Sequence, residues 1–591
     1  MSRTDSVEAA LLVALCLCGL PWACARSAPA QRASALLVTL DTTRADALAC
    51  YGNPLPTSPN LDRLAAEGVL FESAHTTVPV TLPAHASMLT GLYPPRHRLR
   101  DNGVVGLAAE ARTLAEVARE AGWQTAAFVG SVVLAPLFGI EQGFEHYSAP
   151  ARTSGVDSQR PHGAERRASE VVDEALAWLA RRDRERPFLV WVHLYDPHHP
   201  YAPPADFDAA PFAGEPYLAE VAYADAQVGR LLDALRADGT LDGTAVLVTS
   251  DHGEAFGEHG EFTHGGYCFE ETLRVPFLLR RPGEPRAGER SPFEVSVVDV
   301  LPTLAAALGL EVPRGIDGVD LGAVPLSGVE PRGVYFESYY GYLSFGWSPL
   351  AGWLRSGGKY LHSSSPAWFE LAEDPLERND RIADRADAAR EARVAIARIL
   401  ERDLLPAPED EDGEHAELLD AIRSLGYAGV GGASTELPSP LATSDLPAPH
   451  HQSSFFTLRG EAEAHEAAGR PERALEAYRT ALRENPRNSF ALEEVGRLLL
   501  ATGDTAGAVA ALEELVADHA PQARRSFGLG AALVAAGRSE DALEPLRHAV
   551  ELSHGRPRYV QALVGVLRSL GRTEEAERLS AAYLACEERE Q

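Results

Sequence analysis

The fold is decided by two stretches of sequence, Leu36-Leu37-Val38-Thr39-Leu40-Asp41 and Val246-Leu247-Val248-Thr249-Ser250-Asp251-His252-Gly253. Each is a continuous apolar run that stops abruptly at an acidic residue. Such runs are typical of central strands in a parallel sheet, and open parallel sheets bind ligands at the carboxyl ends of their strands. Carboxylates combined with an imidazole are ligands for a divalent metal ion. The two stretches therefore predict a metal site at the carboxyl ends of two strands of the sheet.

A third stretch between these two supplies a hydroxyl group. It reads Thr81-Leu82-Pro83-Ala84-His85-Ala86-Ser87-Met88-Leu89-Thr90-Gly91, and Pro83 fits the first turn of a short helix. A free threonine hydroxyl is a poor nucleophile at neutral pH, and coordination to a divalent ion is the usual remedy. The sequence therefore predicts that the metal activates Thr81 at the start of this helix.

The composition indicates an ordinary globular protein of more than one domain. At 591 residues the chain is too long for a single hydrophobic core. Its formal net charge of -31 repels phosphate backbones, which argues against a nucleic-acid partner. Lys359 is the only lysine in the chain.

The N-terminal segment has the pattern of an export signal. Residues 9–25 form a short apolar run that ends in Ala23-Cys24-Ala25, which fits cleavage by signal peptidase. We expect residues 1–25 to be a signal peptide and the protein to be periplasmic or secreted, with an uncleaved membrane anchor as the alternative. Cys50, Cys268 and Cys586 would remain after cleavage, and their spacing predicts free thiols.

Three further regions follow the N-terminal segment. Residues 33–405 alternate strand-like and helical runs, which predicts an α/β domain with a mostly parallel sheet. Within it, residues 333–385 have alternating aromatic stretches that predict a small antiparallel sheet. Residues 406–455 are rich in Pro, Gly, Ser and acidic residues and are predicted to be a linker with one helical island at 418–425.

Residues 456–591 contain an internal repeat of 34 residues. The repeat is carried by two sets of small residues, namely Gly469, Gly503, Gly537 and Gly571, and Ala474, Ala508, Ala542 and Ala576. This period resembles tetratricopeptide repeats, which are all-α units of paired helices. The resemblance implies a surface that binds a partner protein; self-association or a rigid spacer is the alternative.

The order of motifs in the first 380 residues resembles the alkaline phosphatase superfamily, specifically its sulfatase-like branch. The matching motifs are Asp41-Thr42-Thr43-Arg44-Ala45-Asp46, Pro59-Asn60-Leu61-Asp62-Arg63-Leu64, the stretch 81–91, Asp101-Asn102-Gly103, Asp196-Pro197-His198-His199-Pro200-Tyr201, Asp251-His252-Gly253-Glu254, Arg274-Val275-Pro276 and Glu373-Asp374-Pro375-Leu376-Glu377-Arg378-Asn379.

The resemblance implies roles for individual residues. The metal ligands would be Asp41, Thr81, Asp251 and His252, and Thr81 would also be the nucleophile. Asn102 and His85 would bind substrate, and His198 and His264 would contact substrate oxygens or assist the leaving group. Plainer roles exist for two of them, because Asn102 also suits a turn and His198 could simply pack among prolines, where His199 competes with it. One divalent ion is expected, with manganese or zinc favoured by the imidazole ligand and calcium or magnesium as alternatives.

The chain departs from the true sulfatases at the nucleophile. Those enzymes carry Cys or Ser in the motif C/S-x-P-x-R and convert it to formylglycine, whereas here the stretch is Thr81-Leu82-Pro83-Ala84-His85. Threonine offers no route to that aldehyde by the usual conversion, and the lysines that clamp the sulfate are missing. We therefore predict cleavage or transfer of a phosphoester or phosphonate, as in the phosphodiesterases of the superfamily, on a small-molecule, lipid or glycan ester. The alternatives are a sulfatase that works without formylglycine and a non-catalytic scaffold that acts through the repeats.

Overall fold

The computed structural model describes residues 32–102, 106–150, 165–324, 331–406, 437–519, 521–553 and 555–583. The predicted signal segment at 1–25, the helical island at 418–425 and Cys586 lie outside the described residues. The chain divides into Met1–Arg32 and a compact unit that begins at Ala33.

A central sheet of eight strands organises the first part of this unit. The order across the sheet is β4-β3-β5-β1-β6-β7-β2-β8. Neighbouring strands are parallel except that β7 runs antiparallel to both β6 and β2, so the predicted mostly parallel sheet is confirmed. The strands are β1 (Ser34–Leu40), β2 (Val69–His75), β3 (Gln124–Val129), β4 (His146–Ser148), β5 (Phe188–Leu194), β6 (Thr244–Ser250), β7 (Phe277–Arg280) and β8 (Glu289–Ser296).

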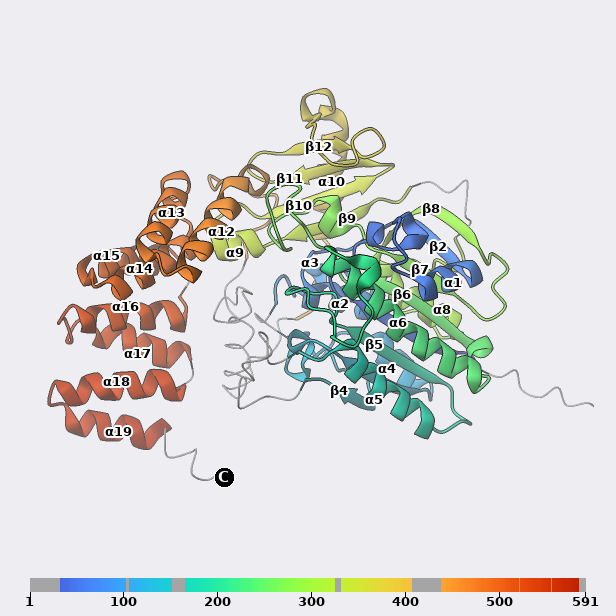
Figure 1. The fold of residues 1–591 in the computed structure, drawn as a ribbon, viewed down its shortest axis with the longest axis horizontal. Coiled ribbons are helices and arrows are strands. Elements are labelled where there is room, and N and C mark those ends of the chain that lie inside the picture. Colours follow the sequence, from blue (N-terminus) through green and yellow to red (C-terminus); the bar gives the residue numbers. More distant parts are fainter. Residues whose placement is uncertain are drawn as a thin grey trace, which may run out of the picture. The chain divides into compact units, whose positions relative to one another are not determined.

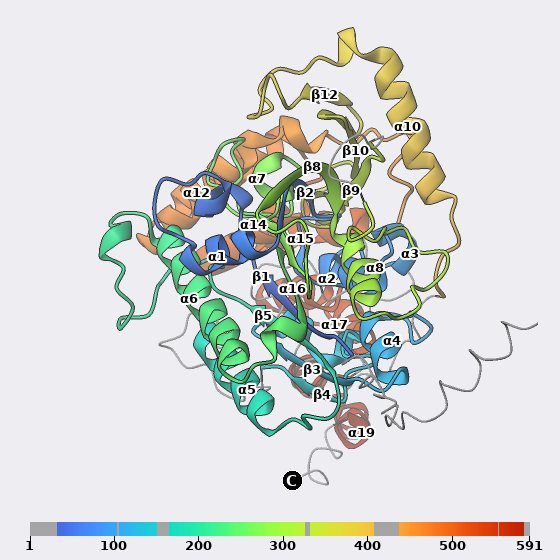
Figure 2. The same cartoon turned by 90° about the vertical axis from the view of Figure 1, so that its right-hand side faces the viewer.

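Helices cover both faces of the sheet, which explains why its central strands are apolar throughout. Figure 2 shows one group of helices on each side of the strands. Each group closes its own buried hydrophobic cluster. One face carries α1 (Pro59–Glu67), α5 (Ala168–Arg181) and α6 (Pro216–Ala237), and the other carries α2 (Thr81–Thr90), α4 (Leu114–Glu120) and α8 (Val300–Ala307); the short helices are α3 (Pro94–His97) and α7 (Glu270–Leu273).

A second sheet of four antiparallel strands follows, as the alternating aromatic pattern predicted. Its order is β12-β11-β10-β9, with every pair antiparallel. Helix α10 packs against β10 and β11. The elements are β9 (Val334–Ser338), α9 (Tyr340–Phe345), β10 (Leu350–Arg355), β11 (Gly358–His362), β12 (Ala367–Glu370) and α10 (Ala386–Leu400).

The chain's only lysine lies in this second sheet and is completely buried. The Nζ atom of Lys359 is 3.0 Å from Glu270 Oε1 and 2.7 Å from Glu377 Oε1. Burial alone would lower the pKa of the Lys359 ammonium, but the two carboxylates outweigh it and raise that pKa to about 12. Lys359 is thus a structural cation in the second sheet.

Replacing this lysine is expected to destabilise the fold. The variant Lys359→Met keeps the length of the side chain but leaves two buried carboxylates without their cation, which should lower the free energy of unfolding by about 3 kcal/mol or more. Urea unfolding measures this difference. The matched control is Arg390→Met, which removes a largely exposed ion pair with Asp387 and should cost less than about 1 kcal/mol. Equal unfolding midpoints for the two variants would contradict the structural role of Lys359.

The C-terminal part consists of helical hairpins with the predicted 34-residue period (Figure 1). Gly469, Gly503, Gly537 and Gly571 all have positive φ, between 68° and 89°, which turns the chain between the two helices of a hairpin. The four alanines of the repeat are fully buried, so they allow the helices to pack closely. The helices are α12 (Ser453–Ala467), α13 (Pro471–Glu484), α14 (Ser489–Thr502), α15 (Thr505–Asp518), α16 (Ala523–Ala535), α17 (Leu543–Leu552), α18 (Pro557–Ser569) and α19 (Thr573–Tyr583).

Cys50 and Cys268 are both free, as predicted; Cys268 is buried and Cys50 is partly buried. Within the described ranges, every helix is too short or too polar to cross a membrane.

Candidate metal and nucleophile site

The candidate site lies where β1 and β6 end. These two strands are parallel neighbours, with Leu40 paired with Ser250, so the residues that follow them, Asp41 and Asp251, emerge at the same edge of the sheet. Both carboxylates are fully buried. The two apolar strands therefore place their acidic groups at the carboxyl edge of the sheet, where open parallel sheets bind ligands.

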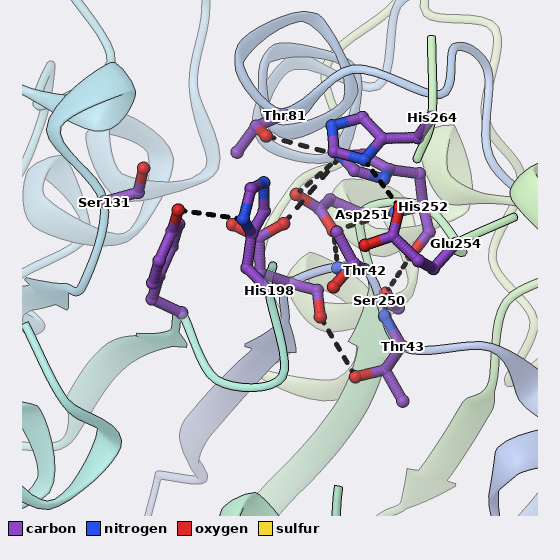
Figure 3. A network of polar contacts seen from close by, with 12 residues as sticks. Thr42, Thr43, Thr81, Ser131, His198, Ser250, Asp251, His252, Glu254 and His264 are labelled. Atoms are coloured by element: carbon purple, nitrogen blue, oxygen red, sulfur yellow. Dashed lines mark hydrogen bonds and ion pairs between the residues drawn. The ribbon is translucent and has the colours of Figure 1, made fainter. Parts of the chain in front are cut away.

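Four predicted metal ligands converge at this edge. The Nε2 atom of His252 lies 3.8 Å from Asp41 Oδ1, 3.6 Å from Asp251 Oδ2 and 3.3 Å from the Thr81 hydroxyl. The other ring nitrogen of His252 donates to the Gly253 carbonyl oxygen at 3.0 Å, so the lone pair is on Nε2 and faces the other ligands. Figure 3 shows the side chains of Thr81, Asp251 and His252 directed toward one another.

Thr81 is the first residue of α2, as the position of Pro83 predicted. Its side chain is fully buried against the ligand group. Asn102 fixes the start of this helix, because its Oδ1 accepts a hydrogen bond from the Leu82 amide at 2.8 Å. The Nδ2 of Asn102 is also buried and has no hydrogen-bond partner among the residues that the structure describes. This amide is therefore a donor next to the first turn of α2, and its role in substrate binding stays a prediction.

His85 occupies a different place from the one expected of a substrate-binding residue. Four residues after Thr81 on the same helix, its Nδ1 donates to the Thr81 carbonyl oxygen at 2.8 Å, and its Nε2 accepts from the Thr39 hydroxyl at 3.0 Å. The ring is completely buried, and burial lowers its pKa to about 3. Both ring nitrogens of His85 are thus engaged within the protein, one of them on the backbone of Thr81.

His198 and His264 lie beside the ligand group (Figure 3), with their ring centres 5.3 Å apart. The ring centre of His264 is 4.2 Å from that of His252, and its Nδ1 lies 3.0 Å from Glu254 Oε1. The Nδ1 of His198 lies 2.9 Å from the Tyr195 hydroxyl. Burial lowers the pKa of both imidazoles, that of His264 to about 4, and raises the pKa of Glu254 to about 8. The two histidines are thus held in place by neighbours at the edge of the site.

Two residues of the site were missed by the sequence analysis. The buried His193 in β5 places its Nε2 3.5 Å from Asp41 Oδ2. Thr42 is fully buried and has φ of 47°, which is unfavourable for a β-branched residue. Within the described part of the chain its hydroxyl has no hydrogen-bond partner. The position of Thr42 directly after the predicted ligand Asp41 could have indicated that it belongs to the site. His193 lies inside an apolar strand, where nothing in the sequence distinguishes it from a packed core histidine.

The residues present fit a divalent metal ion. Four buried atoms lack a hydrogen-bond partner from any described residue, namely both Asp41 carboxylate oxygens, Asp251 Oδ2 and the Thr42 hydroxyl, although buried polar atoms are normally paired. Burial raises the pKa of Asp41 to about 7 and also raises that of Asp251, which shows how costly these carboxylates are without a cation. Asp41, Asp251 and His252 form one group able to hold a metal ion. Oxygen ligands with one imidazole suit manganese, zinc or magnesium.

Asp196 does not extend this group to a second ion. Its carboxylate accepts hydrogen bonds from Arg167 at 2.8 Å and from the Ala168 amide at 2.6 Å, at the start of α5. This carboxylate therefore stabilises a helix terminus.

Comparison with known proteins agrees with this architecture. Residues 34–310 match the family model described as Sulfatase, and residues 434–589 match that described as Tetratricopeptide repeat. The chain is 27% identical to the uncharacterized sulfatase YidJ of Escherichia coli (strain K12) over 60% of this chain and 84% of that protein. It is also 27% identical to an arylsulfatase of Clostridium perfringens, over 59% of this chain and 89% of the relative.

Among solved structures, the fold resembles the phosphonate monoester hydrolase of Agrobacterium radiobacter. The TM-score is 0.52 at 23% sequence identity, and the match covers 62% of this chain and 95% of that protein. A second similar structure is a Bacteroides fragilis protein described as the putative sulfatase yidJ, with a TM-score of 0.51 at 21% identity over 63% of this chain and 97% of the other.

Proposed function

Because the chain carries a sulfatase-family domain followed by tetratricopeptide repeats, we propose that it is a metal-dependent hydrolase or transferase that cleaves phosphoesters or phosphonates with Thr81 as nucleophile. The observation that carries this proposal is the place of the Thr81 hydroxyl, 3.3 Å from His252 Nε2 and beside two buried carboxylates. A nucleophile that is activated by a metal ion has to lie beside the metal ligands, and the residue beside them here is a threonine.

The divalent ion held by Asp41, Asp251, His252 and Thr81 would lower the pKa of the hydroxyl and offset negative charge on the substrate. Thr81 then has no need of the aldehyde that sulfatases make from Cys or Ser. His85 supports the nucleophile by holding the carbonyl of Thr81, which fixes the first turn of α2.

The reaction follows from the groups around Thr81. Its Oγ, whose proton has passed to solvent, forms a bond to phosphorus, and the bond between phosphorus and the alcohol oxygen breaks. The departing oxygen takes a proton from the hydrogen-bonded pair of His264 and Glu254, and Asn102 Nδ2 donates to a non-bridging oxygen. Water or an acceptor hydroxyl then attacks phosphorus, returns its proton to His264 and releases Thr81.

The experiment that tests the proposal is a comparison of matched esters. The full chain, reconstituted separately with manganese, zinc, magnesium and calcium, is assayed on aryl phosphate monoesters, phosphodiesters, phosphonates and sulfates. We expect turnover of one of the phosphorus esters to exceed that of the sulfate at least tenfold. Faster turnover of the sulfate would reject the proposal in favour of a sulfatase that works without formylglycine, an alternative that the sulfatase relatives support.

A leaving-group test addresses His264 separately. The variant His264→Gln should lower turnover of an alkyl ester about 10²-fold, because an alkoxide leaves poorly without a proton, but should lower turnover of a 4-nitrophenyl ester far less. The control is His259→Gln on the same loop, whose imidazole instead contacts Glu271 at 2.6 Å. Equal losses on both esters would show that His264 does not protonate the leaving group.

For the remaining parts of the chain, we propose export to the periplasm or medium and binding of a partner protein by the repeats. Support for the second role comes from a cavity of about 390 Å³ among α14, α16 and α18, which includes the arginine side chains of Arg497, Arg524 and Arg558.

A further inference from the structure

The space in front of the reactive groups is shared between the two parts of the chain. A pocket of about 410 Å³ is lined on one side by Val80, which directly precedes the nucleophile, and by His198 and His264. Its other side is formed by Phe456, Arg459, Gly460 and Glu463, all from α12, the first helix of the repeats. A substrate that reaches Thr81 through this pocket therefore contacts the repeat domain.

Helix α12 is fixed in this position by a continuous core. Phe455 packs against Phe345 and Trp347 of the second sheet region, with ring centres 4.7 and 5.8 Å apart. Two buried hydrogen bonds add to this contact: Asn485 Nδ2 donates to the Phe345 carbonyl oxygen at 2.8 Å, and the Ser489 hydroxyl donates to that of Ser344 at 2.7 Å. Buried apolar side chains from both parts of the chain form one cluster, so α12 is held in place as one wall of the pocket.

The side chains of this wall are arranged for a polar ligand. Arg459 donates to Glu463 at 2.8 Å and lies over the Phe490 ring, 4.7 Å from its centre, which holds the guanidinium in one orientation. The pair presents donors and acceptors together with no net charge. Tyr340 and Phe456 add aromatic surface to the same pocket. Apolar walls with a few placed polar groups are typical of small-molecule sites.

Gly460 keeps the pocket open. A glycine in the middle of a helix destabilises it by about 1 kcal/mol relative to alanine. A Cβ atom at Gly460 would meet nothing within 4 Å, so packing between helices does not require this glycine. Its lack of a side chain instead leaves room in the pocket beside Arg459.

We infer that α12 is a specificity element of the active site, and that Arg459, Glu463 and the space above Gly460 receive the alcohol part of the ester, a ring-sized group that carries hydroxyls. This inference rests on the proposed function, since it assigns the far end of the same substrate. It gives the first repeat a role in substrate selection in addition to any role in binding a partner.

The test uses the full chain and two esters of whichever acid the enzyme cleaves, one of ethanol and one of a hexose. Wild-type protein should have at least a tenfold higher kcat/KM for the hexose ester. Gly460→Leu and Arg459→Met should each reduce this preference at least tenfold, mainly by raising KM for the hexose ester. The matched control is Glu461→Leu, which places the same side chain at the next, exposed position of α12.

The outcomes separate the two proposals. Failure of the wild type to cleave any of the aryl phosphorus esters above would overturn the proposed function and the inference with it. No turnover of the ethanol and hexose esters by a protein that cleaves an aryl phosphorus ester would overturn only the inference. Turnover with equal kcat/KM for the two esters, or a preference that both variants keep, would overturn only the inference. Gly460→Leu removes no contact of the folded protein. Its effect on the preference for the hexose ester therefore tests the inference even where Arg459→Met proves unstable.

Discussion

Thr81→Ala should abolish turnover, with a loss on the order of 10⁴-fold or more, because the variant lacks the attacking oxygen. The Thr81 hydroxyl is buried and lies against His252, so the substitution removes one oxygen and one methyl group from a packed site. Thr81→Ser is the matched control, since it keeps the hydroxyl and should retain measurable turnover. Steady-state kinetics on the best phosphorus ester would compare the three proteins.

A covalent intermediate provides a second readout of the same prediction. Rapid acid quenching of the wild-type reaction, followed by peptide mass spectrometry, should show a phosphorylated or phosphonylated Thr81, and the label should be missing from Thr81→Ala. A variant with more than a tenth of wild-type turnover, or a label on another residue, would contradict the role of Thr81.

The parts of the site that were predictable from the sequence are those in which local pattern and position coincide. The apolar runs that end at Asp41 and Asp251 predict both the strands and the metal ligands, because apolar central strands must stop where the sheet meets a polar site. Pro83 likewise marked the start of α2, and the structure places Thr81 there. The helical hairpins of the structure also follow the predicted 34-residue period, since each repeat packs mainly on its neighbours.

The residues whose places differ from the sequence prediction depend on contacts that the pattern of the sequence does not show. His193 reaches Asp41 because β5 lies next to β1 in the sheet, with His193 paired with Thr39, and that order cannot be read from β5 itself. His85 was assigned to substrate from its place in the motif, but a residue four positions along a helix faces back toward Thr81. Arg459 lies 378 positions from Thr81 in the sequence, and only the packed core that fixes α12 brings its side chain to the pocket.

Removal of the metal should lower turnover by orders of magnitude, although less than removal of the nucleophile. Wild-type protein is expected to hold one divalent ion per chain, and exhaustive chelation should lower turnover on the order of 10³-fold or more, with recovery on addition of manganese or zinc. Asp251→Asn should lose both the ion and the recovery, because the buried carboxylate that supplies its charge becomes a neutral amide. Elemental analysis of the purified proteins measures the ion independently of activity.

Thermal unfolding distinguishes a metal site from a merely structural cluster. In the metal-free protein the two buried carboxylates lack a counter-charge, so added metal should raise the Tm of the wild type, by linkage of binding to folding. The control is Asp225→Asn, which removes another buried carboxylate, one that accepts hydrogen bonds from the Leu61 and Asn60 amides. This control should be destabilised yet keep its ion and its metal-dependent rise in Tm, whereas Asp251→Asn should lose that rise. A Tm that is indifferent to metal in the wild type would mean that Asp41 and Asp251 are paired with each other as a protonated structural pair, and the nucleophile would then have to be activated by His252 alone.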